Sequence, residues 1–440
     1  MLVSNTVKRE SRKQPLILEA RGVPFNFNSA TWAIAGILIV MLIGCNIGGS
    51  NSSRAENIVS ISGTASESQI LLDSAVDEEA VHLVWKEEGT GISYQSLQHG
   101  TSSWSQANVF PNTASERVTP HVYHRDQELI LMGFEGGLKV WASTGGEERW
   151  REVPSRTLEL VPPNHSVAQE EGNVYLVFER QGEIFLINSG DFGRSWSEPI
   201  QVAVISDSRP SAFPSLSIAA RDDDLTVVWA EQYRRPNGTY RSRLQIVRSS
   251  DRGKTWSAAD RIPLDRSQYG DSYDEAYSFR HVKVVPARDS IWLFYIERGL
   301  FLQRSAFEKQ GWTRSERIAE APSGSFDVHE DDSSVVVAWS DERNREKDWW
   351  GYIPGHQVLT WNIDPRWANN DLYFARFGAS GREEQRLTPP LSFVSAQSGS
   401  ISISASPDQI YVFWSGRTKV GETLDQYGFP NEVFYTTLSN

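Results

Sequence analysis

The chain has 440 residues and a formal net charge of −13, with 39% hydrophobic and 22% charged residues. These fractions are typical of a folded globular protein and exclude a chain that is mainly disordered. The first 44 residues carry a net charge of +3, so the remainder carries −16, which argues against nucleic acid as a partner. The 16 Trp, 14 Tyr and 19 Phe favour β-structure.

The N-terminal segment has the composition of a targeting signal. Basic residues precede an apolar run over 31–44, which is shorter than the roughly 20 residues that a spanning helix needs. The run ends in Leu-Ile-Gly-Cys45, which resembles a bacterial lipobox, and Cys45 is the single cysteine. We therefore predict a signal peptide with lipobox over 1–44, a flexible tether over 45–56, and an exported protein that is lipid-anchored at the extracytoplasmic side of the cell membrane. The alternative is an uncleaved signal anchor in which Cys45 has no role.

A unit of about fifty residues repeats along the rest of the chain. Each unit contains a short run of branched and aromatic residues, as expected for a strand that is buried on both faces. The seven runs are 81–85, 129–134, 174–178, 225–229, 291–295, 335–339 and 410–414.

Polar turns place further strands before and after each of these runs, so each unit is expected to be a four-stranded antiparallel blade. The seventh unit lacks a fourth strand, and the spare strand 57–62 can supply it and close the ring, which removes exposed sheet edges. We predict an all-β fold, a β-propeller over 57–440 with seven blades. Six blades remain the alternative if one hairpin is a decoration.

Two turns between third and fourth strands share the pattern Ser/Thr-x-Asp-x-Gly-x-Ser/Thr-Trp. Their Asp and hydroxyl side chains can bond nearby backbone groups, the Gly accepts a positive φ, and the Trp buries a large ring. The residues concerned are Ser189, Asp191, Gly193, Ser195 and Trp196 in the first turn, and Ser249, Asp251, Gly253, Thr255 and Trp256 in the second.

These two turns, in register with the repeat, resemble the Asp-box (BNR repeat) propellers of the sialidase-like superfamily. The resemblance implies that the Asp-box residues are structural and lie on the face opposite the active site. The loops that join second to third strands, and fourth to first strands, would then share the functional face. Long loops on a rigid scaffold usually carry function.

The longest of these loops are rich in aromatic residues, which suit stacking on sugar rings. The sixth unit contributes Trp349, Trp350 and Trp361, together with Arg343 near its start, and the seventh contributes Arg417. We interpret these residues as candidate ligand contacts. The alternative is that the Trp side chains pack the loops on themselves and plug the channel.

Catalytic sialidases of this family use three arginines on the substrate carboxylate, a Tyr activated by Glu as nucleophile, and an Asp as acid/base. On this chain the resemblance implies Arg280, Arg343 and Arg417 for the carboxylate, Tyr277 with Glu231 or Glu275 for the nucleophile pair, and Asp274 for the acid/base. The Phe-Arg-Ile-Pro-like motif that carries the first arginine in that family is absent near the first unit, and 279–282 is the nearest match.

Two hypotheses about function follow. One is a sialidase-type exo-glycosidase acting on extracellular glycans, and the other is a non-catalytic propeller that binds a glycan or a protein partner at the cell surface. The chain shows no metal-binding His/Cys pattern, nucleophile elbow or phosphate loop, so we predict no metal and no cofactor. We expect a monomer.

Overall fold

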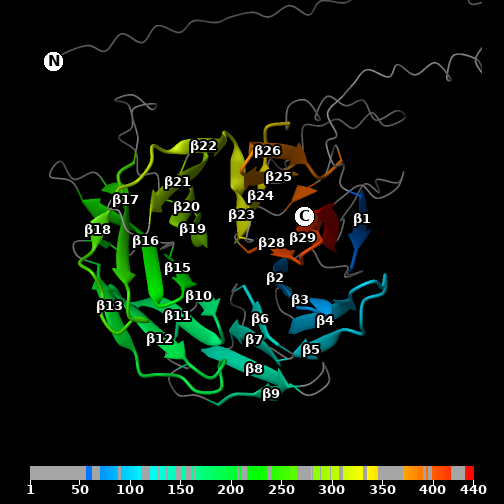
Figure 1. Ribbon diagram of the computed structural model, residues 1–440, viewed down its shortest axis with the longest axis horizontal. Helices are drawn as coiled ribbons and strands as arrows, with labels where there is room; N and C mark the ends of the chain where they lie inside the picture. Colours follow the sequence, from blue (N-terminus) through cyan, green and yellow to red (C-terminus); the bar gives the residue numbers. More distant parts are fainter. Residues whose placement is uncertain are drawn as a thin grey trace, which may run out of the picture. The chain divides into compact units, whose positions relative to one another are not determined.

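The computed structural model describes residues 56–61, 70–87, 91–110, 119–126, 128–134, 137–144, 150–154, 158, 161–162, 164–205, 208–209, 216–234, 240–264, 279, 281–287, 289–297, 299–306, 311–330, 334–344, 370–389, 393–394, 399–417 and 432–440. These residues form seven antiparallel sheets arranged in a ring (Figure 1). The predicted seven-bladed propeller is therefore confirmed, and the six-bladed alternative is wrong. Nowhere in the described part of the chain is there a helix long and apolar enough to cross a membrane.

Each blade has four strands that follow one another from the central channel to the rim. Blade 1 consists of β2 (Ile70–Val76), β3 (Ala80–Glu87), β4 (Ile92–Gln98) and β5 (Asn108–Phe110). Blade 2 consists of β6 (His121–Arg125), β7 (Glu128–Phe134), β8 (Leu138–Thr144) and β9 (Arg151–Glu152). Blade 3 consists of β10 (His165–Glu170), β11 (Asn173–Arg180), β12 (Glu183–Ser189) and β13 (Ile200–Val204).

Blades 4 to 6 repeat the same order. Blade 4 consists of β15 (Leu216–Arg221), β16 (Asp224–Arg234), β17 (Tyr240–Ser249) and β18 (Asp260–Arg261), with the short β14 (Ser208–Arg209) added beside β16. Blade 5 consists of β19 (His281–Ala287), β20 (Ser290–Ile296), β21 (Leu300–Ala306) and β22 (Glu316–Ala319). Blade 6 consists of β23 (Pro322–Glu330), β24 (Val335–Asp341), β25 (Asp371–Gly378) and β26 (Gly381–Arg386).

Blade 7 joins the two ends of the propeller. It consists of β28 (Ile401–Ala405), β29 (Gln409–Arg417) and β30 (Glu432–Ser439), with β1 (Glu56–Ser60) as its outermost strand and β27 (Phe393–Val394) beside β29. Strand β1 pairs antiparallel with β30, for example Val59 with Tyr435. The predicted closure by an N-terminal strand is confirmed.

The core lies in the seams between neighbouring blades. Large rings near the ends of second strands pack on the preceding blade: Trp229 on blade 3, Trp339 on blade 5 and Trp414 on blade 6. All three are at most 2% exposed. This explains the runs of branched and aromatic residues in the sequence, because both faces of each sheet are covered.

A belt of polar side chains joins the inner strands around the channel. One residue of each inner strand holds the equivalent register position: Asp73, His121, Ser166, Ser217, Lys283, Asp327 and Ser402. Several of them accept a hydrogen bond from the backbone N–H of the next blade, at 3.0 Å for Ser217 with Val284 and 2.8 Å for Asp327 with Ile403. Asp327 also pairs with Lys283. The belt therefore links blades that are otherwise held by apolar packing.

The two turns that share the Ser/Thr-x-Asp-x-Gly-x-Ser/Thr-Trp pattern have closely matching hydrogen bonds. In the turn between β17 and β18, the Ser249 hydroxyl accepts from the N–H of Gly253 at 2.8 Å and donates to the Asp251 carboxylate at 2.8 Å. That carboxylate accepts from the Thr255 N–H at 2.9 Å and from its hydroxyl at 2.6 Å. The bonds from Thr255 lower the pKa of Asp251 to about 2. Gly253 has a φ of +83°, which favours glycine.

The first of the two turns, between β12 and β13, repeats this arrangement with Ser189, Asp191, Gly193 and Ser195. In both turns the Trp indole donates to the Gly carbonyl at 3.1 Å, from Trp196 in one and Trp256 in the other. The Asp191 and Asp251 carboxylates therefore accept hydrogen bonds from residues of their own turns.

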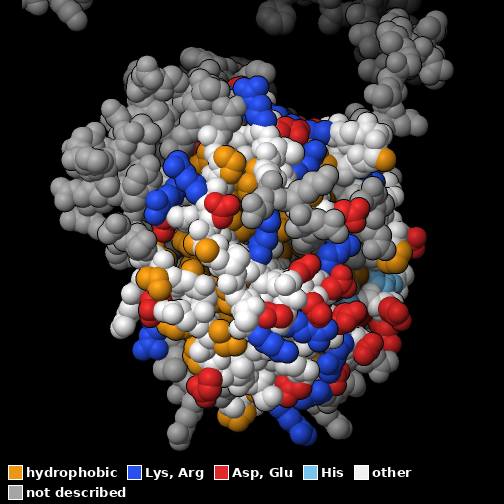
Figure 2. All heavy atoms as spheres, turned by 60° about the vertical axis from the view of Figure 1, so that its left-hand side comes forward, with side chains coloured by type: hydrophobic (Ala, Val, Ile, Leu, Met, Phe, Trp, Pro, Cys, Tyr) orange, Lys and Arg blue, Asp and Glu red, His pale blue; other side chains and the backbone are white. Residues whose placement is uncertain are grey.

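Figure 2 looks onto the side that carries β13, β17 and β18, where acidic and basic side chains are interspersed.

Candidate functional site

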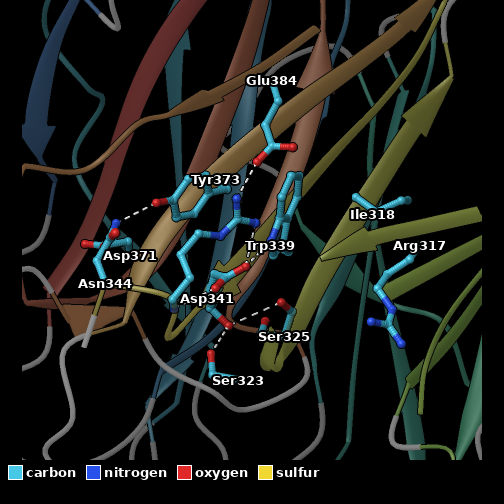
Figure 3. Close-up of polar contacts among 12 residues, drawn as sticks. Arg317, Ile318, Ser323, Ser325, Trp339, Asp341, Asn344, Asp371, Tyr373 and Glu384 are labelled. Atoms are coloured by element: carbon cyan, nitrogen blue, oxygen red, sulfur yellow. Dashed lines mark hydrogen bonds and ion pairs between the residues drawn. The ribbon is translucent and has the colours of Figure 1, made fainter. Parts of the chain in front are cut away.

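Second strands lead into third strands at the end of the blades that lies opposite the turns around Asp191 and Asp251. This end is called the top face below. On this face, the corner of blade 6 at the end of β24 brings together several charged and polar side chains (Figure 3). Asp341 is fully buried there. Its carboxylate accepts hydrogen bonds from the Trp339 indole at 2.9 Å, from the Arg343 N–H at 2.8 Å and from the Arg343 guanidinium at 2.7 Å.

Arg343 is held from three sides in this corner. Its guanidinium bonds Asp341, bonds Glu384 at 2.6 Å, and lies 4.0 Å from the centre of the Tyr373 ring. Burial alone would lower the pKa of Arg343, but the hydrogen bonds and charges of Asp341 and Glu384 raise it above its ordinary value. The guanidinium therefore stays charged, and two carboxylates of its own blade already use its donors.

The same corner clamps the two ends of the long loop of blade 6. Asn344, at the start of the loop, donates to the Asp371 carboxylate at 3.0 Å and to the Tyr373 hydroxyl at 2.6 Å. Asp371, at the end of the loop, is 1% exposed and also accepts from Arg386 at 2.6 Å. These contacts fix the positions from which residues 345–369 leave the blade.

Glu231 of blade 4 lies in an equivalent corner. It is 4% exposed and accepts from Gln245 at 2.8 Å and from the Trp229 indole at 3.4 Å. Its charge is balanced by an ion pair with Arg243, which faces it across the β16–β17 ladder. Trp-x-acid is thus a feature shared by blades 4 and 6.

The structure does not bring Glu231 and Arg343 together, because blade 5 separates their blades and each has its ionic partners in its own sheet. Arg417 ends β29 and pairs with Phe393 through the ladder, but its side chain lies outside the described residues. The remaining predicted site residues also lie outside them: Cys45, Asp274, Glu275, Tyr277, Arg280, Trp349, Trp350 and Trp361. Their predicted roles stay predictions.

Several residues of these corners were not predicted from the sequence. Arg243 could have been found, because hairpin register places it opposite Glu231. Asp371 is the first residue of β25 and stands opposite Asp341, so hairpin register gives the same kind of signal. Nothing in the sequence connects Glu384, on the outermost strand of blade 6, with Arg343. Among the described residues, no group of three or more His, Cys, Asp or Glu side chains is placed to hold a metal ion.

No family model and no curated protein matches the sequence. Among solved structures, an ulvan lyase of polysaccharide lyase family PL25 is 11% identical with a TM-score of 0.48, over 87% of this chain and 93% of that chain. YCF48 bound to a D1 peptide is 12% identical with a TM-score of 0.47, over 88% and 98%. A mutant of the Aleuria aurantia lectin in complex with a methyl fucoside is 9% identical with a TM-score of 0.43, over 74% and 96%. Such values assign the chain to no family.

Proposed function

We propose that this protein is exported, anchored to the cell membrane through Cys45, and binds extracellular glycans at the top face of blades 4 to 7 without cleaving them. The long loops of this face belong to these blades, and the loop of blade 6 carries Trp349, Trp350 and Trp361. Indole rings give large, flat contact areas for the apolar faces of sugars.

The pairing of Arg343 carries the proposal. A sialidase-type site needs guanidinium donors that are available to a substrate carboxylate, whereas Arg343 is bonded to Asp341 and Glu384. Glu231, one of the two candidates for activating a nucleophile, is buried and paired with Arg243. Both arrangements support a platform that holds loops in place, and they favour an uncharged ligand over an acidic one.

A glycan-array screen of the full chain, run beside a fluorogenic sialoside hydrolysis assay, tests the proposal. We expect binding without hydrolysis, and at least about tenfold weaker binding for Trp349→Ala or Trp361→Ala, since stacked aromatic anchors commonly contribute this much. Val204→Ala, on the exposed β13 at the rim, is the matched control. Hydrolysis would establish the sialidase-type hypothesis instead, with Arg280, Arg417, Tyr277, Glu275 and Asp274 as its candidates. Binding of a protein but no glycan would establish the scaffold hypothesis.

The location is tested separately. Cys45→Ala should release the protein from the membrane fraction or stall processing of the precursor, because the lipid would have no attachment point. A variant that stays in the membrane at full precursor length, like the wild type, would establish the uncleaved signal anchor.

A further inference from the structure

The corner of blade 7 differs from those of blades 4 and 6 at one position. Two residues after Trp229 and Trp339 stand the carboxylates Glu231 and Asp341, but two residues after Trp414 stands Gly416. Trp414 is fully buried, and its indole N–H has no hydrogen-bond partner among the described residues. A buried donor without an acceptor is costly, so native structures seldom leave one unfilled.

The Trp414 ring is packed in the same way as the Trp339 ring of blade 6. The Trp414 and Phe434 rings, which face each other across the ladder, are 5.7 Å apart and inclined by 23°. The corresponding pair in blade 6, Trp339 and Tyr373, is 5.8 Å apart and inclined by 24°. The two indoles are therefore stacked alike on their cross-strand partners, but in blade 7 the position that Asp341 holds in blade 6 is taken by Gly416, which has no side chain to accept the Trp414 N–H.

An acceptor for a second hydrogen bond stands at the same corner. Glu432 pairs with Gly416 across the β29–β30 ladder, and the Ser60 hydroxyl of β1 holds one of its carboxylate oxygens at 2.6 Å. Paired residues of an antiparallel ladder project to the same face, with Cβ positions roughly 5 Å apart. The corner thus offers one donor, from Trp414, and one anionic acceptor, from Glu432.

We propose that the top of the seam between blades 6 and 7 is a subsite for a hydroxyl group of an uncharged sugar. The hydroxyl oxygen accepts from the Trp414 indole, and its proton is donated to Glu432. A hydroxyl satisfies both groups, whereas a ligand carboxylate can accept from Trp414 but is repelled by Glu432. The inference rests on the proposed glycan binding and adds to it the position and the charge class of the ligand.

The variant Trp414→Phe removes the donor and keeps a ring, and Trp339→Phe is its matched control. Trp339→Phe breaks a formed bond to Asp341, so it should lower the midpoint of urea unfolding more than Trp414→Phe does. Trp414→Phe should weaken binding of the array-identified glycan about tenfold, the loss of one good hydrogen bond.

Indole NMR gives a readout that does not depend on the array. The Trp414 N–H resonance of the ¹⁵N-labelled full chain is assigned by its loss in Trp414→Phe. Methyl glucoside, methyl galactoside and methyl mannoside are then added, with methyl glucuronide as the charged comparison. We expect at least one neutral glycoside to shift this resonance, and Glu432→Gln to reduce the shift, with the glucuronide having no effect.

The possible outcomes separate the two proposals. If a glycan binds while the Trp414 resonance stays unchanged and Trp414→Phe binds normally, a water molecule fills the corner and the subsite is wrong, although glycan binding stands. If the glucuronide shifts the resonance more than the neutral glycosides do, the assigned charge class is wrong. If no glycan binds in either experiment, both proposals fall.

Discussion

The corners of blades 4 and 6 each bury a carboxylate, but the arginines that neutralise it come from different positions. In both, a buried carboxylate two residues after a Trp accepts the indole N–H and is neutralised by one arginine. In blade 4 the arginine is Arg243, which stands opposite Glu231 on the neighbouring strand. In blade 6 it is Arg343, which follows Asp341 by two residues in the sequence. The repeat therefore determines the position of the acid, whereas the arginine that neutralises it comes from a different position in each blade.

The residue opposite each acid gives a reason for the difference. In blade 4 the β16–β17 ladder places Arg243 opposite Glu231. In blade 6 the β24–β25 ladder places a second acid, Asp371, opposite Asp341. There the corner draws its cation from the near end of the loop, and Asn344 ties this end to Asp371 at the far end.

The largest expected effect is that of Asp341→Ala. It leaves the Arg343 charge and the Trp339 N–H without their buried acceptor, and breaking one side of a buried pair costs about 3–5 kcal/mol. Urea unfolding of the full chain measures this. A loss below about 1 kcal/mol would mean that the blade 6 corner relaxes and that the parallel with blade 4 is superficial.

The variant Arg243→Met tests the blade 4 corner by removing the cation of the pair and leaving the acid. It removes the cation of blade 4 and leaves Glu231 with the Gln245 amide and the Trp229 indole, so we expect a loss of about 2–4 kcal/mol, somewhat less than for Asp341→Ala. The double variant Arg243→Met with Glu231→Leu should recover most of this, since an apolar replacement of a buried pair is often neutral. Failure of the second change to restore stability would show that Glu231 has a role beyond the pair.

The turn around Asp251 gives a smaller effect that depends on pH. The folded pKa of Asp251 is about 2, below the ordinary 3.8. Its contribution to stability is therefore fully present above about pH 4 and is lost as the pH falls toward 2. In Asp251→Asn this part of the acid dependence should be missing. An unchanged slope of unfolding free energy between pH 4 and 2 would contradict this reading.

The smallest expected effect is that of Glu384→Gln. Glu384 is partly exposed on β26, and its pair with Arg343 is the outer of the two. Removing this charge should cost about 0.5 kcal/mol, less at high salt, because exposed pairs are weak. A cost comparable to that of Asp341→Ala would make Glu384 an equal member of the corner.

The repeat made most of the fold predictable. Branched and aromatic runs that are buried on both faces recur seven times along the chain, and the missing last strand identified β1 as the closing strand. The acids Glu231 and Asp341 also follow from the repeat, because they stand at a constant offset from the Trp. Their partners do not, since Glu384 reaches Arg343 from a strand that is remote in sequence. The unfilled donor of Trp414 became visible only beside the filled ones of blades 4 and 6.

The central claim is that the Arg343 guanidinium binds the carboxylates of the blade 6 corner and does not bind a ligand carboxylate. Isothermal titration of the full chain with an array-identified neutral glycan and with its sialylated counterpart tests this most directly. We predict that sialylation leaves the affinity unchanged or weakens it, because Asp341 and Glu384 occupy the guanidinium and the propeller is acidic. Tighter binding of the sialylated glycan that is lost in Arg343→Gln, in a variant that still unfolds cooperatively, would contradict the claim.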